Sequence, residues 1–277
     1  MAADAPRRLL PAKVTAPGGR RLGIWRAGPD NGPMVVLLPG FSWPGGMWES
    51  VVSRLPAHWC VVAPDLPGAG ASAWLPADEL GVGAYLSDLM ATYDLPGRAP
   101  LVGGYSMGGR AAWHLALKLG GSCRGLLGVS CAPGRSATGE QPDREAWLDG
   151  WARRFGSEDS EAVLAEWDAQ PLLGGRELAP PDVARWRLRG EALDRLLVAW
   201  ADHRGTRVPP ELASPELPSP AALLVGAGDT TYVARTEGLA GRRMVPDASH
   251  ALPWQAPEVV AAVLAELMKG PDPRPSS

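Results

Sequence analysis

The sequence is poor in cysteine and has no excess of positive charge. Its three cysteines, Cys60, Cys123 and Cys131, form no C-x-x-C pair and have no histidine at metal-binding spacing. We therefore expect neither a disulfide framework nor a bound metal. Lys plus Arg number 27 and Asp plus Glu 30, for a formal net charge of -3. Because nothing in this balance would neutralise a phosphate backbone, we expect no nucleic-acid partner.

Long apolar runs are also missing. No uninterrupted run approaches the roughly 18 residues that a membrane-spanning helix needs, so we expect no membrane association. Arg7 and Arg8 near the N-terminus are not followed by an apolar stretch, so we expect no signal peptide and a cytoplasmic location.

What the sequence does contain is an alternation of strand and helix patterns over 277 residues, enough for one large domain. Short apolar runs, typical of strands buried on both faces, cover Met34 to Leu38, Cys60 to Ala63, Leu101 to Val102, Gly125 to Val129 and Ala221 to Val225. Helical patterns cover Gly46 to Leu55, Ala77 to Tyr93, Met107 to Leu119 and Pro257 to Met268. This alternation predicts an α/β fold, with a mostly parallel sheet covered by helices on both faces.

The strand pattern vanishes between about residues 135 and 215, where the sequence is helical and rich in Arg and Trp. We interpret 135–215 as a helical lid inserted into a discontinuous core formed by 1–134 and 216–270. Residues 271–277, with three prolines, are expected to be a disordered tail. Tryptophan is abundant, with 12 residues against 2 Phe and 4 Tyr.

A nucleophile motif lies between the third apolar run and the helix that follows it. Gly104-Tyr-Ser-Met-Gly108 fits the pattern G-x-S-x-G, in which small residues allow a strand to turn sharply into a helix. The pattern predicts Ser106 as the nucleophile, exposed at the helix N-terminus. The alternative is a glycine-rich turn whose serine only caps the helix.

A catalytic serine needs a base and an acid. Of the four histidines, only His250 lies in a loop between a late strand, Arg242 to Val245, and the last helix. The chain order Ser–acid–His then favours Asp229, which follows the strand at Leu223, over Asp247. The backbone N–H groups of Met107 and Phe41, after the nucleophile and after the first buried run, are the predicted oxyanion donors.

One further motif matches the residue pattern of a dinucleotide-binding loop but is not followed by the helix that such a loop needs. Gly68-Ala-Gly-Ala-Ser-Ala73 matches G-x-G-x-x-A, but Trp74-Leu-Pro76 interrupts the helix that such a site requires. We interpret the segment from Asp65 to Ser72 as a structural turn.

Together these segments resemble the α/β-hydrolase superfamily from Leu22 to about Met268. Within it, the sequence is most similar to the 2-succinyl-6-hydroxy-2,4-cyclohexadiene-1-carboxylate synthases, lyases of menaquinone synthesis. The segments that carry this resemblance are Gly104-Tyr-Ser-Met-Gly-Gly-Arg110, Trp151-Ala-Arg-Arg-Phe155, Ala165-Glu-Trp-Asp-Ala-Gln-Pro171 and Asp229-Thr-Thr-Tyr232.

The resemblance implies a lyase that eliminates pyruvate from 2-succinyl-5-enolpyruvyl-6-hydroxy-3-cyclohexene-1-carboxylate. Ser106, made basic by His250 and Asp229, would take the ring proton, without a metal or an organic cofactor. The implied substrate is a small anionic metabolite. The residues expected to bind it are Tyr105, Arg110, Arg144, Trp167 and one of Arg185, Arg187 and Arg189, with Arg187 favoured. Each of these arginines could instead belong to an ordinary solvated helix face.

The chain departs from that family at Pro39, Thr231, Ser249 and in the stretch from Ala251 to Trp254. Two other functions therefore stay open. One is a serine hydrolase that acts on a small ester, thioester or C–C bond. The other is a member of the fold that only binds a ligand. Several arginines facing one pocket would favour the lyase, and an apolar lid would favour the hydrolase.

Overall fold

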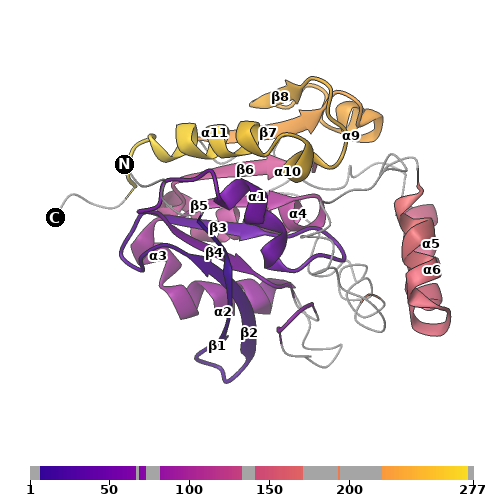
Figure 1. The fold of residues 1–277 in the computed structure, drawn as a ribbon, viewed down its shortest axis with the longest axis horizontal. Coiled ribbons are helices and arrows are strands. Elements are labelled where there is room, and N and C mark those ends of the chain that lie inside the picture. The colour runs from indigo at the N-terminus through magenta and orange to yellow at the C-terminus, as the bar shows by residue number, and fades with distance from the viewer. Residues whose placement is uncertain are drawn as a thin grey trace.

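The computed structural model describes residues 7–66, 69–72, 82–132, 141–170, 193 and 220–273. Its centre is an eight-stranded sheet in the order β1-β2-β4-β3-β5-β6-β7-β8 (Figure 1). The strands are β1 (Leu10–Thr15), β2 (Arg21–Ala27), β3 (Met34–Leu38), β4 (Cys60–Pro64), β5 (Leu101–Tyr105), β6 (Gly125–Val129), β7 (Ala221–Gly226) and β8 (Arg242–Val245). β1 pairs antiparallel with β2 and β2 antiparallel with β4, and every later pairing is parallel. The predicted mostly parallel sheet is confirmed.

The helices occupy the segments between strands. They are η1 (Gly45–Trp48), α1 (Glu49–Val52), α2 (Val82–Tyr93), α3 (Leu95–Arg98), α4 (Met107–Leu119), η2 (Gly120–Ser122), α5 (Gln141–Ser157), α6 (Ser160–Asp168), α9 (Thr230–Arg235), α10 (Leu252–Gln255) and α11 (Pro257–Met268). The bounds of α4 and α11 are those expected from the apolar periodicity. The helix expected at Gly46 to Leu55 is instead η1 followed by α1.

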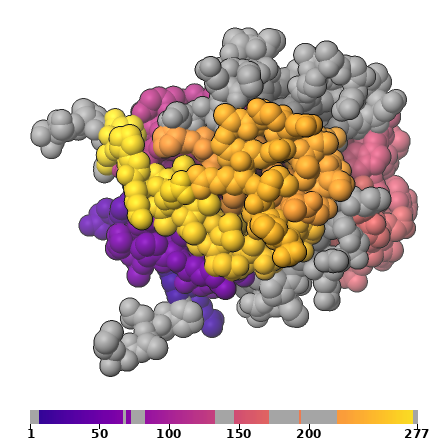
Figure 2. Space-filling model, turned by 90° about the horizontal axis from the view of Figure 1, so that it is seen from above, coloured from indigo at the N-terminus to yellow at the C-terminus, as the bar shows by residue number. Residues whose placement is uncertain are grey.

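Both faces of the sheet are buried. Along β3, Val35 and Leu37 belong to the apolar cluster that includes residues of α1 and α11. Their neighbours Val36 and Leu38 belong to the cluster that includes residues of α2 and α4. Since successive side chains of a strand point to opposite faces, helices cover the sheet on both sides, as predicted. Figure 2, seen from above the β8 edge of the sheet, shows α11 beside the β7–β8 region.

The segment between β6 and β7 contains the helical pair α5 and α6. In Figure 1 this pair lies at the right-hand end of the molecule. Residues 133–140 and most of 171–219 lie outside the described residues, so the bounds of the lid stay a prediction.

Past α11, residues 271–273 form neither helix nor strand, and Asp272 makes an ion pair with Arg124. Within the described ranges, no helix is both long and apolar enough to cross a membrane.

Candidate active site

Ser106 lies at the point where β5 turns into α4. Its backbone has φ 50° and ψ -113°, a conformation that residues other than glycine rarely adopt. A Cβ added at Gly104 would lie 2.2 Å from the carbonyl oxygen of Gly108, and one added at Gly108 would lie 2.2 Å from that of Pro39. The two glycines of the motif are therefore required by close backbone contacts, and the strained serine projects from the tip of the turn.

His250 and Asp229 lie beside this serine. The Nδ1 atom of His250 is 2.7 Å from Oδ2 of Asp229, and its Nε2 atom is 3.1 Å from Oγ of Ser106. Both side chains are almost inaccessible, with relative exposures of 1% for His250 and 3% for Asp229. With Nδ1–H donating to Asp229, Nε2 can accept the hydroxyl proton of Ser106, which is the arrangement needed to activate a serine.

The structure places Asp229 against His250, and it explains how Asp229 is oriented. Asp229 caps the N-terminus of α9, where its Oδ1 accepts a hydrogen bond of 3.2 Å from the backbone N–H of Tyr232. Its other oxygen is therefore left for the imidazole. Asp247, the alternative acid, lies in the loop between β8 and α10, with φ 54°.

The two predicted oxyanion donors lie on either side of the same turn. Met107 is the first residue of α4, where helix N–H groups lack intrahelical acceptors. Phe41 follows Gly40, at which a Cβ would lie 2.7 Å from the ring of Tyr105. The next residue, Ser42, is fully buried with φ 67°. The loop is thus tightly constrained next to the N–H of Phe41.

The side chain of Phe41 packs on the α5–α6 pair. Its ring centroid lies 4.7 Å from that of Trp167 and 5.8 Å from that of Phe155. Trp167 in turn contacts Trp151 at 5.2 Å and Trp147 at 5.5 Å. The ring contacts of Phe41 are therefore with Phe155 and Trp167, in an apolar cluster that also contains Leu148, Ala152, Val163 and Leu164.

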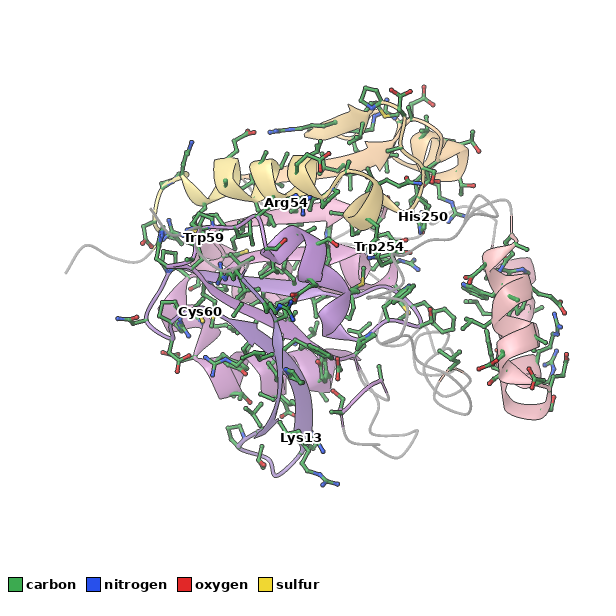
Figure 3. The ribbon with its side chains drawn as sticks, viewed as in Figure 1. Lys13, Arg54, Trp59, Cys60, His250 and Trp254 are labelled. Carbon is green, nitrogen blue, oxygen red and sulfur yellow. The ribbon has the colours of Figure 1, made fainter. Side chains whose placement is uncertain are left out.

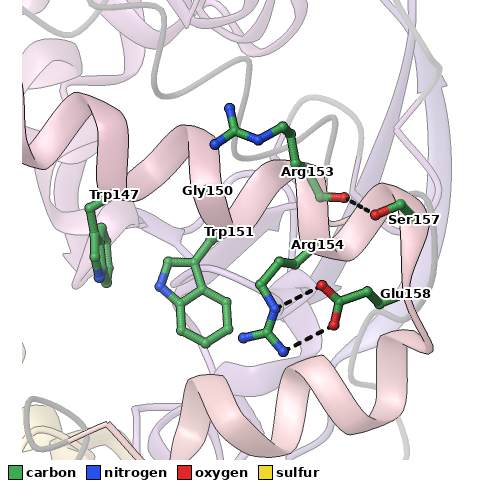
Figure 4. A pocket seen from close by; sticks show the side chains of 7 residues that line it. All are labelled: Trp147, Gly150, Trp151, Arg153, Arg154, Ser157 and Glu158. Atoms are coloured by element: carbon green, nitrogen blue, oxygen red, sulfur yellow. Dashed lines mark hydrogen bonds and ion pairs between the residues drawn. The ribbon is translucent and has the colours of Figure 1, made fainter.

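A groove of about 640 Å³ lies along α5, lined by Trp147, Gly150, Trp151, Arg153, Arg154, Ser157 and Glu158 (Figure 4). Nε of Arg154 donates to Glu158 at 3.0 Å, and Nη1 donates to Glu166 at 2.7 Å. The guanidinium of Arg154 also lies 5.0 Å from the ring of Trp151. This arginine holds α5 to α6 and is already paired with carboxylates of the protein.

Of the residues expected to bind substrate, the structure describes the side chains of some and not of others. Arg110 lies in the first turns of α4, half-buried, where its charge acts on the thiol of Cys131. Arg144 lies in α5, but its side chain is outside the described part, as are Arg185, Arg187 and Arg189. Tyr105 is buried, with its ring centroid 5.3 Å from that of His250. The structure thus brings Tyr105 and Arg110 to the serine turn, and Trp167 to Phe41.

Two aromatic side chains near His250 were not predicted from the sequence. The ring of Tyr232 lies 5.1 Å from the imidazole, and Trp254 in α10 lies 5.7 Å from Tyr105. Figure 3 labels His250 and Trp254 at the end of the sheet nearest to the α5–α6 pair. The sequence spacing could have predicted the place of Tyr232, because it lies three residues after Asp229. An N-cap residue and the third residue of its helix are neighbours in space.

The turn after β4 is held by a buried carboxylate. Asp65 accepts hydrogen bonds from Nε1 of Trp25 at 2.9 Å and from the backbone N–H groups of Gly45 and Ala71, each at 2.8 Å. Burial raises the pKa of Asp65 above its usual range. These hydrogen bonds support the interpretation of the segment as a structural turn, of which residues 67 and 68 lie outside the described part. Among the described residues, no group of three or more His, Cys, Asp and Glu side chains could hold a metal ion.

Comparisons with known proteins agree with the fold. The family model described as "Alpha/beta hydrolase family" matches residues 35–263. A 2-succinyl-6-hydroxy-2,4-cyclohexadiene-1-carboxylate synthase of Enterobacter sp. (strain 638) is 31% identical over 89% of this chain and 96% of its own. Among solved structures, "MenH from S. aureus" is similar with a TM-score of 0.74 and 19% identity, over 89% of this chain and 97% of its own. A thermophilic esterase from Thermogutta terrifontis is similar with a TM-score of 0.72 and 24% identity, over 94% and 98%.

Proposed function

The chain belongs to the alpha/beta hydrolase family, and we propose that it is a carbon–oxygen lyase of menaquinone biosynthesis. Its reaction would eliminate pyruvate from 2-succinyl-5-enolpyruvyl-6-hydroxy-3-cyclohexene-1-carboxylate. The observation that carries the proposal is the hydrogen-bonded series from Ser106 through His250 to Asp229 at a strained strand-to-helix turn. The relative from Enterobacter, which has the name of this lyase, supports the choice of reaction.

The elimination needs a base, and the site supplies one. His250 accepts the proton of the Ser106 hydroxyl at Nε2, and Asp229 stabilises the resulting imidazolium at Nδ1. The Ser106 oxygen then takes a proton from a ring carbon of the substrate. The electron pair of that C–H bond forms a new ring double bond, the existing ring double bond shifts by one carbon, and the bond from the ring carbon to the enolpyruvyl oxygen breaks. The methylene carbon of the departing enolpyruvate takes up the proton held by His250, which gives pyruvate, so no acyl-enzyme is formed.

The negative charge that develops on the substrate during this step needs hydrogen-bond donors that stabilise it. The N–H groups of Phe41 and Met107 lie on the loop after β3 and at the start of α4, beside Ser106. A carbonyl oxygen conjugated to the deprotonated ring carbon would receive their hydrogen bonds. Such preorganised donors stabilise a transition state by about 3 kcal/mol each in a site closed to water.

The substrate would be a small metabolite bearing carboxylates. Arg110, in the first turns of α4, is the proposed carboxylate partner in the described region, because a guanidinium can form two parallel hydrogen bonds with a carboxylate. Arg144 and Arg187 are the proposed partners from the lid. Tyr105 would donate a hydrogen bond, and Trp167 would pack on the ring.

The direct test is release of pyruvate from the enolpyruvyl intermediate by the purified protein. Ser106→Ala should abolish this release. Ser87→Ala, which removes an exposed hydroxyl from α2, should leave it unchanged. Rapid cleavage of nitrophenyl esters together with no reaction on the intermediate would contradict the lyase.

A second candidate is a serine hydrolase acting on a small ester, thioester or C–C bond. The specific observation in its favour is the aromatic lining of the α5–α6 pair, where Phe155 and Trp167 face the oxyanion loop. Such a surface suits an apolar acyl group. In this case Ser106 would attack the carbonyl carbon, and mass spectrometry of the protein quenched during turnover would show an added acyl group on Ser106.

A further inference from the structure

Two tyrosine rings contact the imidazole of His250. The centroid of Tyr105 lies 5.3 Å from it with an interplanar angle of 48°, and that of Tyr232 lies 5.1 Å away with an angle of 30°. All three side chains are buried, at 3%, 7% and 1% relative exposure for Tyr105, Tyr232 and His250. Both tyrosine rings therefore pack against the imidazole at a tilt, while its Nδ1 and Nε2 atoms meet Asp229 and Ser106.

Tyr232 contacts the acid as well as the base. Its backbone N–H donates to Oδ1 of Asp229, and the neighbouring Oδ2 accepts the hydrogen bond from His250. Its side chain also packs in the apolar cluster of Cys131, Leu223 and Val225, which ties the first turn of α9 to β7. Tyr232 thus contacts both the carboxylate of Asp229 and the imidazole of His250, and its position affects the orientation of both.

The charge of the imidazole changes during the reaction. It becomes a cation when it takes the proton of Ser106, in a position closed to water. Asp229 compensates this charge at one edge only. Aromatic faces within about 6 Å attract cations through the ring quadrupole, and this attraction is larger where water is excluded. Arg235 lies 5.8 Å from the centroid of Tyr232, so this ring already accepts one cation contact.

We infer that Tyr232 is a positioning residue for His250, holding the imidazole in plane and stabilising its protonated form through the ring face. The inference rests on the Ser106–His250–Asp229 part of the proposed function and holds for either reaction. It also assigns a role to the aromatic character of position 232. The phenol oxygen is not required, because the ring face makes the contact.

The test compares Tyr232→Leu with Tyr232→Phe and with replacement of Tyr232 by a trifluorinated phenylalanine, which has the same shape and weaker π electrons. The measurements are the rate at which a fluorophosphonate labels Ser106, and kcat and KM for pyruvate release, each over a range of pH. Val233→Ala, which trims the next side chain of the same helix and cluster, is the matched control.

We expect Tyr232→Leu to lower the labelling rate and kcat about tenfold, with KM changed less than about twofold. The acidic midpoint of both pH profiles should move down by about half a pH unit, since the protonated base loses its ring contact. Tyr232→Phe and Val233→Ala should keep nearly the full rate. The trifluorinated residue should reproduce most of the loss without a change in melting temperature.

Two results would overturn the inference while leaving the proposed function standing. One is a trifluorinated protein as active as Tyr232→Phe. The other is a loss in Tyr232→Leu that Val233→Ala matches, with unmoved midpoints. A wild-type protein whose Ser106 is not labelled would show that the catalytic series itself is wrong, and the proposed function would fall together with the role of Tyr232.

Discussion

The ring of Phe41 lies 4.7 Å from the indole of Trp167, although 126 residues separate them in the chain. Within the described residues, Phe41 alone comes from outside the inserted helical segment in the apolar cluster built around Phe155. Its backbone N–H is at the same time a proposed oxyanion donor. The packing of α5 and α6 is therefore coupled to the position of that donor.

This coupling predicts that Phe155→Leu lowers kcat by about threefold to tenfold, because an aromatic pair contributes about 0.5–1.5 kcal/mol beyond its buried area. KM should change less than kcat, since Phe155 is not a proposed substrate contact. Steady-state kinetics of pyruvate release provide the measurement. Trp151→Phe is the control, because Trp151 contacts Phe155 and Trp167 but makes no ring contact with Phe41 in the described structure. Equal losses in the two variants would refute the coupling.

A second prediction concerns Gly108, the last glycine of the nucleophile motif. A Cβ at Gly108 would lie 2.2 Å from the oxygen of Pro39 and 2.3 Å from that of Leu38, so Gly108→Ala must push the oxyanion loop away from α4. We expect activity to fall about a hundredfold, the usual effect of losing one oxyanion donor. Gly83→Ala in α2 meets nothing within 4 Å and should instead raise the free energy of unfolding by about 0.5 kcal/mol. Activity assays and urea titrations of both variants check the pair, and an active Gly108→Ala would contradict the steric argument.

A third prediction follows from the buried thiols. Burial raises the pKa of Cys123 to about 11 and that of Cys131 to about 12, from a model-peptide value of 9.0. Above pH 9 the unfolded chain loses these protons while the folded chain keeps them, so stability falls as pH rises from about 9 to 12. Between pH 8 and 10 each thiol should lower the free energy of unfolding by about 1 kcal/mol.

Urea titrations at the two pH values measure this loss. Cys131→Ala should reduce the dependence on pH even if the variant is less stable at both values. A thiol reagent at pH 8 should react with neither Cys123 nor Cys131 in the folded protein and with all three cysteines in denaturant. Rapid labelling of Cys131 in the native protein would contradict the burial argument.

A fourth prediction concerns Asp65. Replacement by Ala removes the acceptor of three donors, the buried ones of Trp25 and Gly45 and the partly buried one of Ala71. We expect Asp65→Ala to lower the free energy of unfolding by about 3 kcal/mol or more. The control is Asp159→Ala at the exposed N-cap of α6, where one hydrogen bond is lost and about 1 kcal/mol is expected. Equal midpoints for the two variants in urea would show that the donors around Asp65 find other partners.

Some parts of the site could be predicted because their causes are local. Gly104 and Gly108 are required by contacts within the serine turn and with the loop beside it, so the motif marks the turn wherever it occurs. The buried parallel strands show as continuous apolar runs because both of their faces are covered. β1 and β2 escaped prediction since β1 is largely exposed and β2 mixes Arg and Gly with its apolar residues.

The sequence by itself therefore determined the mostly parallel sheet covered by helices, the nucleophile turn and the candidates for base and acid. These depend on apolar periodicity, on small residues and on chain order, all of which are readable in short windows. Only the tertiary structure decided that Asp229 meets His250, that Tyr232 contacts both, and that Phe41 packs on Trp167. Apart from the local contact between Tyr232 and Asp229, these contacts join segments that are distant in the chain, and they depend on how side chains fill the space between packed elements.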